Sequence, residues 1–234
     1  MIFHTQFLAV TLFRVVKYSE LFLWHNIVEC PKQICFQYLK KLHLNKKYFN
    51  TRHNKCYCSI CYKPSEPKVL PVVNPKYTVP IDWVSFGIQV DKAFASNNQI
   101  FKKWYTTFYG TSKDKLNDII HNRFIPFPGD DLLSGRKFTL NLPDQHHIYT
   151  SPSINYSSLD HVSPADKVDI NNQWYDFQVV LQCKQNPAYI EKKSSGKPNV
   201  CNLLPNAKLQ WKTDQRSSVV PCSLLIRATK RSTV

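Results

Sequence analysis

The stretch Trp104-Tyr-Thr-Thr-Phe-Tyr-Gly-Thr111, with the residues that follow it as far as Tyr156, decides the fold of this chain. Its apolar and aromatic residues predict a buried strand that ends at Gly110. Ser112 then stands where a serine can cap a short helix. Residues 148–156 predict a second strand that enters another helix. A strand ending in Gly-Thr, a short helix and a Ser-x-x-Tyr segment together form a layout that can clasp a nucleotide.

Much of the remaining chain has the pattern of strands. The runs rich in alternating, β-branched or aromatic residues are 81–90, 137–142, 174–183, 209–213 and 219–227. Pro221 indicates that the last of them starts at a sheet edge, because proline has no N–H to donate to a second neighbour. With few long helices among many short strands, the expected class is α+β, built on a split antiparallel β-sheet core with short helices.

The chain is expected to have three parts. Residues 1–52 predict a helical N-terminal extension, in which the lysines beside Leu39 and Leu42 indicate a basic helix. Residues 53–80 hold a small Cys/His cluster and a Pro-rich linker. Residues 81–234 contain most of the predicted strands and form the main domain.

The charge of the chain favours anionic partners. There are 31 Lys and Arg against 16 Asp and Glu, for a formal net charge of +15. Such an excess favours nucleic acid, nucleotides or acidic lipid, although it also serves solubility. A hydrophobic fraction of 43% excludes intrinsic disorder over most of the chain. No stretch reaches the length of an uncharged helix that would span a bilayer.

The cysteines indicate a reducing compartment and a metal. Three of the eight are too close together for an ordinary disulfide framework, which favours a cytoplasmic location. With a nearby histidine they form a set that suits tetrahedral zinc: His53, Cys56, Cys58 and Cys61. Cys30, Cys35 or Cys201 could complete the shell instead, and free thiols in a loop are the alternative. No nearby glutamate is placed as a general base, so a structural zinc is expected rather than a catalytic one.

A series of short motifs, in one order, resembles a known family over about three-quarters of the chain. The motifs are His53-x-x-Cys-x-Cys-x-x-Cys61, Val79-Pro-x-x-Trp-x-x-Phe-Gly87, Trp104-x4-Tyr-Gly-Thr111, Pro128-Gly-Asp130, Ile148-Tyr-x-Ser-Pro-x-x-x-Tyr156, Phe177-Gln-Val-Val180 and Gln210-Trp-x-Thr213. They resemble the C-terminal region of the neuralized-like protein four family, which is similar to a divergent ADP-ribosyltransferase domain of the poly(ADP-ribose) polymerase type. The neuralized repeats and a RING-type cysteine array are missing, so ubiquitin-ligase activity does not follow from the resemblance.

The resemblance implies an NAD site. In the transferases the first strand ends in His-Gly-Thr or His-Gly-Ser, where the histidine holds the adenosine ribose and the glycine backbone pairs with the nicotinamide carboxamide. This chain keeps Gly110 and Thr111 but has Tyr109 in place of the histidine, which implies weakened NAD binding. Further along, the resemblance gives Ser153 a hydrogen bond to the carboxamide and Tyr156 a stacking position on the nicotinamide ring.

The resemblance also implies the catalytic positions. Tyr149 matches the tyrosine of the second core strand, and Gln210 stands where the family has a glutamate that stabilises the cationic transition state. Glutamine keeps the hydrogen-bond geometry but loses the charge, and removing one such electrostatic contact costs about 100- to 1,000-fold in rate. Glu191 is the alternative acid, and plain core packing is the alternative role for Tyr149 and Tyr156.

Three functions are therefore in competition. The first is a divergent ADP-ribosyltransferase-like domain with weak or lost NAD-dependent catalysis, which acts as a binding or regulatory module for a protein, NAD or ADP-ribose. The second is an active mono-ADP-ribosyltransferase that uses Tyr149. The third is a zinc-stabilised basic module that binds nucleic acid, motivated by the net charge and the cysteine cluster.

Overall fold

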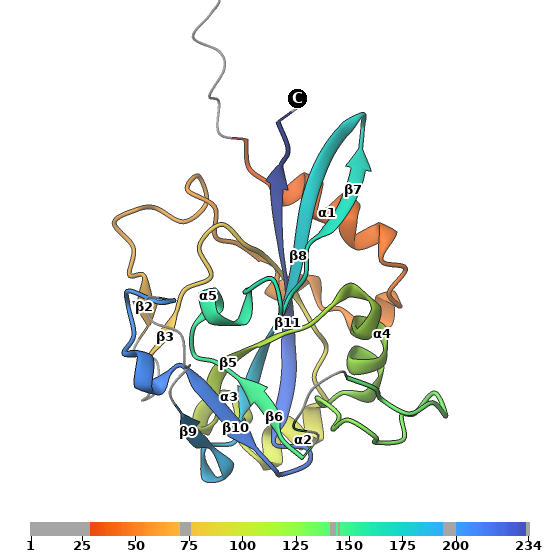
Figure 1. Ribbon diagram of the computed structural model, residues 1–234, viewed down its shortest axis with the longest axis vertical. Helices are drawn as coiled ribbons and strands as arrows, with labels where there is room; N and C mark the ends of the chain where they lie inside the picture. Colours follow the sequence, from red (N-terminus) through yellow and green to blue (C-terminus); the bar gives the residue numbers. More distant parts are fainter. Residues whose placement is uncertain (1–28, 71–75, 141–143, 145, 194–199, 233–234) are drawn as a thin grey trace, which may run out of the picture.

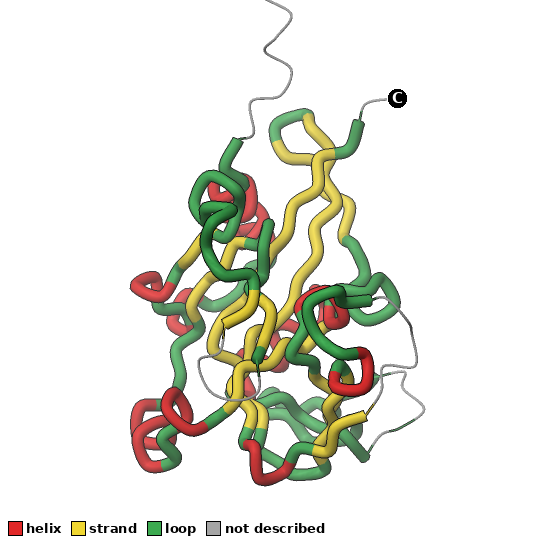
Figure 2. Tube along the Cα trace, turned by 90° about the vertical axis from the view of Figure 1, so that its left-hand side faces the viewer, coloured by secondary structure: helices red, strands yellow, loops and turns green. Residues whose placement is uncertain are grey.

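The centre of the molecule is an antiparallel sheet with short helices around it (Figures 1 and 2). The structure, a computed structural model, describes residues 29–70, 76–140, 144, 146–193 and 200–232. Residues 1–28 of the predicted N-terminal extension lie outside the described residues. Within the described part of the chain, no helix is both long and apolar enough to cross a membrane.

The main sheet has six strands, and all of its pairings are antiparallel. Its order is β1-β4-β11-β8-β5, with β7 also paired to β8. The strands are β1 (Lys55–Cys56), β4 (Val84–Gly87), β5 (Tyr105–Gly110), β7 (Asp166–Ile170), β8 (Gln173–Gln185) and β11 (Val219–Lys230). The two longest strands, β8 and β11, lie side by side in the middle and therefore organise the sheet (Figure 1).

Two smaller sheets accompany the main one. The first has the order β6-β10-β9 and is also antiparallel, and the second is the pair β2-β3. Their strands are β2 (Val69–Leu70), β3 (Tyr77–Thr78), β6 (Ile148–Thr150), β9 (Glu191–Lys193) and β10 (Gln210–Thr213). Phe108 and Ser151 exchange backbone hydrogen bonds of 2.7 and 2.9 Å, which join the β6 end to β5. The predicted α+β class with mostly antiparallel strands and short helices is thus confirmed.

Helices cover both faces of the main sheet. They are α1 (Lys32–Lys41), α2 (Lys92–Asn97), α3 (Ile100–Lys103), α4 (Lys113–Asn122) and α5 (Ile154–Ser157), with 3-10 turns η2 (Lys46–Tyr48), η3 (Thr51–His53), η4 (Pro187–Tyr189) and η5 (Asn206–Lys208). Side chains alternate along a strand, so neighbours on β8 enter different cores. Leu181 packs in the larger core with α1 and α4, whereas Val180 packs with Phe108 and with Ile154 of α5.

Helix α1 lies in the segment that was predicted as a helical extension, and its apolar side packs in this core. Tyr38 is buried, stacks on Phe177 of β8 with ring centroids 4.1 Å apart, and donates a 3.0 Å hydrogen bond to Asp166. Cys35 is completely buried on the same helix. The apolar side of α1 is therefore used inside the protein, and its lysines are left on the outside.

Two local predictions differ from the structure, and the one for Pro221 agrees with it. Ser112 precedes α4, but its side chain makes no capping hydrogen bond. Pro221 lies where β11 pairs with β8 alone, so the strand starts at an edge as predicted, although further along it lies between β4 and β8. The proline is tolerated because the register shifts between Pro221 and Ser223, and pairing with β4 begins only at Ser223. The strand predicted at residues 137–142 is reduced, in its described part, to a single bridge between Lys137 and Asp131.

Candidate functional site

Four cysteines, one just before α1 and three at the end of β1 or after it, lie close together. Cys30 precedes α1, Cys56 ends β1, and Cys58 and Cys61 lie in the turn that follows. The four sulfur atoms lie within 4.8 Å of one another, and Cys30 Sγ is 3.7 Å from each of the other three. Backbone N–H groups of Cys61 and Tyr62 bond to the carbonyl of Cys58, which folds the turn tightly.

This arrangement fits a tetrahedral metal. A zinc ion with four Zn–S bonds of about 2.3 Å has sulfur atoms about 3.8 Å apart. The three distances of 3.7 Å agree with that edge length. Four thiolates and no open position are typical of structural rather than catalytic zinc. The predicted cluster of Cys56, Cys58 and Cys61 can therefore hold a metal together with Cys30.

His53, which was predicted as the fourth ligand, is not part of the group. It ends the turn η3, its side chain is exposed, and its Cβ lies against Gly87 of β4. The start of α1 brings Cys30 to the position instead. The other two alternative ligands, Cys35 and Cys201, are also outside the group, and Cys35 is buried in the core.

Tyr109 points into the larger core. It pairs with Leu181 of β8 and packs among residues that include Leu116 and Ile119 of α4. Only 7% of its surface is exposed, and burial raises the pKa of its hydroxyl well above the ordinary value. A side chain enclosed in this way serves the core rather than an open ribose site.

Gly110 lies where another part of the protein approaches. A Cβ on Gly110 would overlap the carbonyl oxygen of Ser157 and would lie 2.5 Å from Cγ1 of Val162. Ser157 also donates a 2.9 Å hydrogen bond from its hydroxyl to the Phe108 carbonyl. The close approach that the glycine permits is therefore made by α5. Thr111 follows as a buried residue at the end of the strand.

Ser153 and Tyr156 stand at the start and on the body of α5. Ser153 is completely buried, and within the described residues its hydroxyl oxygen has no hydrogen-bond partner. Tyr156 is half-buried, and burial raises the pKa of its hydroxyl. Since α5 packs on Phe108 and Gly110, both residues lie on the face of β5 opposite to Tyr109.

Tyr149 and Gln210 lie on adjacent strands of the smaller sheet. Lys212 is directly opposite Tyr149, and Gln210 is two residues from Lys212, so all three face the same side. Ser151 faces the same side as Tyr149 and pairs with Phe108, which faces the same side as Gly110. This side of the smaller sheet therefore continues the side of β5 that carries Gly110. The structure thus brings Tyr149, Gln210 and α5 to one face and leaves Tyr109 on the other.

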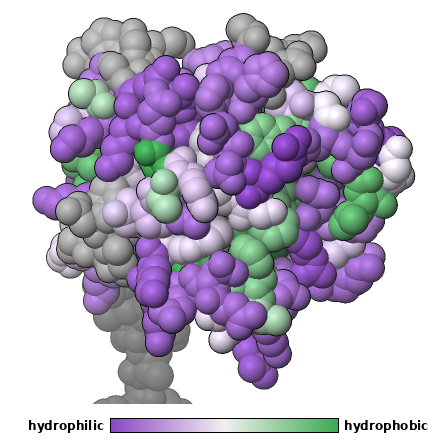
Figure 3. All heavy atoms as spheres, turned by 90° about the horizontal axis from the view of Figure 1, so that it is seen from below, coloured by the Kyte–Doolittle hydropathy of each residue, from purple (hydrophilic) through white to green (hydrophobic). Residues whose placement is uncertain are grey.

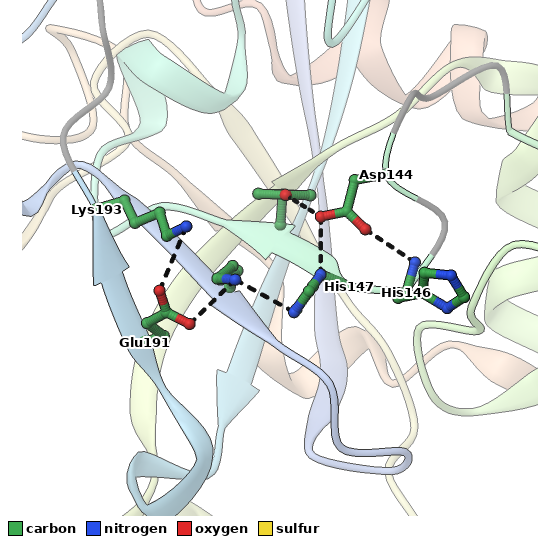
Figure 4. A network of polar contacts seen from close by, with 7 residues as sticks. Asp144, His146, His147, Glu191 and Lys193 are labelled. Atoms are coloured by element: carbon green, nitrogen blue, oxygen red, sulfur yellow. Dashed lines mark hydrogen bonds and ion pairs between the residues drawn. The ribbon is translucent and has the colours of Figure 1, made fainter.

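Tyr149 belongs to a polar network, in which Figure 4 labels Asp144, His146, His147, Glu191 and Lys193. The Tyr149 hydroxyl donates to Asp144, whose same oxygen lies 2.8 Å from Nδ1 of His147. Nε2 of His147 is 3.2 Å from Nζ of Lys212, which forms a 3.0 Å ion pair with Glu191. Glu191 also pairs with Lys193 at 3.4 Å. The network therefore links β6, β10 and β9 by side chains as well as by backbone.

The environment shifts the pKa values of this network in opposite directions. Burial and the hydrogen bond to Asp144 raise the pKa of Tyr149 to about 12, with smaller contributions from Glu191 and Tyr156. The Tyr149 hydroxyl, followed by the backbone N–H of His146, lowers the pKa of Asp144 to about 2. Glu191 raises the pKa of Lys212. At neutral pH, Tyr149 is thus a proton donor, Asp144 an anion and Lys212 a cation.

We expect this carboxylate to contribute to the acid stability of the fold. Because Asp144 binds its proton less readily in the folded than in the unfolded chain, its contribution is present above a pH of about 4 and is lost as the pH falls to about 2. In carboxyl-carbon NMR, Asp144 should titrate near 2, and Tyr149→Phe should raise the midpoint. Tyr189→Phe removes an exposed hydroxyl outside the network and should leave it unchanged. An unaltered midpoint in Tyr149→Phe would contradict the assignment.

Several residues of the two sites were not predicted from the sequence. Lys212 could have been noticed, because the alternation along β10 places it on the face of Gln210. Asp144 and His147 come from the loop before β6 and meet Tyr149 only through its fold (Figure 4). Cys30 was one of three alternative ligands.

The chain matches no protein-family model, and no curated protein matches it.

Proposed function

We propose that this chain is a zinc-stabilised domain of ADP-ribosyltransferase-like fold that has lost NAD-dependent catalysis and acts as a binding module in the cytoplasm. The observation that carries the proposal is the packing at Gly110. The Ser157 carbonyl occupies the space beside the glycine, where the resemblance implies a nicotinamide. Eight free cysteines support a reducing location.

The direction of Tyr109 supports the same proposal. A ribose-holding residue has to reach the ligand from the strand end, but this side chain packs among Leu181 and the residues of α4. Turning it outward would expose a large aromatic ring and leave a hole in the core, which costs several kcal/mol. The core therefore favours a Tyr109 that does not bind nucleotide.

The electrostatics of the opposite face also disfavour transfer. The transition state of ADP-ribosyl transfer is cationic, and an anionic group aimed at it lowers the barrier. Here Gln210 is neutral, and its neighbour on the same face, Lys212, is held in the charged form by Glu191. Tyr149 is engaged with Asp144. We infer that the polar side chains on this face stabilise the β6-β10-β9 sheet and do not stabilise a cationic transition state.

Incubation with labelled NAD tests the proposal. We expect no transfer of label to the protein, and no heat of NAD binding in calorimetry at millimolar ligand. Tyr149→Phe serves as the matched control, because it removes one hydroxyl and keeps the ring. Transfer by the unmodified protein that disappears in Tyr149→Phe would overturn the proposal and favour an active mono-ADP-ribosyltransferase.

A further inference from the structure

One segment of the molecule carries only positive charge. Between Cys30 and Cys61 the chain has seven Lys and Arg residues and no Asp or Glu. All seven are exposed: Lys32, Lys40, Lys41, Lys46, Lys47, Arg52 and Lys55. A zinc held by four thiolates would offset two of these charges, which leaves a clear excess. We call residues 30–61 the basic loop.

The cations of the basic loop have no acidic partners among the described residues. Within the part of the chain that the structure describes, none of its seven cations forms an ion pair. Elsewhere the basic residues are often matched, as in the pairs of Lys113 with Asp166 and Arg216 with Asp130. Two of the seven contact aromatic rings instead, since Lys40 lies 4.6 Å above Phe36 and Lys47 lies 5.1 Å above Tyr48.

The cysteine cluster closes the basic loop on itself. Cys30 stands at its start, and the other three cysteines stand at its end, 26 to 31 residues later. In between, α1 buries Cys35 and Tyr38 against the sheet and presents its lysines outward. A metal at the cluster would therefore hold both ends of a cationic surface in place.

We propose that the basic loop binds the phosphate backbone of nucleic acid. Repeated exposed cations without acidic neighbours provide the sequence-independent attraction that such binding requires. Protein interfaces are depleted in lysine and need an apolar centre, whereas six of these seven residues are lysines. A membrane-binding helix needs a free apolar face, but that of α1 is already packed on the sheet. The inference goes beyond the NAD question, and only its metal dependence rests on the proposed zinc.

Removing the positive charges at the end of α1 and in the turn η2 tests the proposal. Fluorescence anisotropy with a labelled, mixed-sequence RNA strand of about 20 nucleotides gives the affinity over a range of salt. The variant Lys40→Gln, Lys41→Gln, Lys46→Gln, Lys47→Gln should bind about 100-fold more weakly near physiological salt, and its salt slope should fall by about 3. Protection of the same lysines from acetylation by bound RNA gives an independent readout on the unmodified chain.

A matched variant separates this surface from net charge. Lys92, Lys102, Lys103 and Lys208 are exposed, outside the basic loop and without ion pairs among the described residues. Changing these four to glutamine removes the same charge and should reduce affinity by less than about 5-fold. Equal losses in both variants would overturn the proposal. So would binding to phosphatidylserine vesicles, sensitive to the loop variant, without RNA binding. Chelation should weaken RNA binding if zinc holds the loop, whatever the result with NAD.

Discussion

Replacing Cys30 with serine is expected to lower the free energy of unfolding by about 4 kcal/mol or more and to reduce the bound zinc. Loss of a metal site is among the few single changes with effects of this size. Cys30 holds the start of α1 against the turn that follows β1, with its sulfur 3.7 Å from those of Cys56, Cys58 and Cys61. Without the fourth thiolate, both ends of the basic loop are released. In thermal unfolding the midpoint should fall by about 10 °C.

Two matched variants make this result specific. His53→Ala removes the ligand that the sequence suggested, and it should leave zinc content and unfolding nearly unchanged, because His53 is exposed and outside the cluster. Cys222→Ser removes a half-buried thiol that is far from the cluster in sequence. A serine at this position can still donate a hydrogen bond to the Gln182 carbonyl. Elemental analysis of the purified protein gives the metal content. A Cys30→Ser protein that keeps one equivalent of zinc and its stability would rule out the four-cysteine site.

Replacing Gly110 with alanine should also cost several kcal/mol, about 3 or more. The added methyl group would overlap the Ser157 carbonyl, which is backbone and cannot rotate away. Either β5 or α5 has to move, and both take part in the core around Phe108. Urea unfolding at constant pH measures the loss.

Gly135→Ala is the appropriate comparison. Gly135 has a positive φ of 79° but no atom within 4 Å of a Cβ, so the substitution costs only the backbone strain, about 1 kcal/mol. If Gly110→Ala were as mild as Gly135→Ala, the space beside Gly110 would be able to open. The packing argument against nicotinamide at this position would then fail.

Local patterns were sufficient to predict the strands β5 and β8. The runs at 104–111 and 174–183 are apolar and bounded by turn residues, and their conformation follows from neighbours in sequence. The same holds for the helix α4, whose Leu116, Ile119 and Ile120 are spaced along one side. What these patterns could not give is the strand order, because pairing depends on residues far apart in the chain.

The sites were predictable only in part, for the same physical reason. Three cysteines of the metal cluster are close in sequence, but the fourth is brought in by the packing of α1 on β8 and β11. Alternation along β5 separates Tyr109 from Gly110, but it does not say which face the core occupies. The difference between an open ribose site and a buried tyrosine is therefore decided by tertiary packing.

Surface hydropathy gives no strong sign of a further apolar interface on the side that Figure 3 shows. Seen from below, this side is mostly hydrophilic, with hydrophobic residues in a few separate areas. Large exposed apolar side chains include Phe101 of α3, Leu133 and Tyr189 of η4, which are far apart in the sequence. Scattered residues of this kind are normal on a soluble surface.

The place of β11 in the sheet sets the order in which the domain can form during synthesis. This strand, Val219–Lys230, is the last one described, yet it lies in the middle and joins β4 to β8. Until the ribosome has made it, β4 can pair, among the described strands, only with the two-residue β1, and α1 has only part of its buried surface. The four cysteines of the cluster, in contrast, have all been made once residue 61 has emerged. The nascent chain therefore carries its metal ligands early, but α1 has to wait for the final strand before it packs fully and the sheet closes.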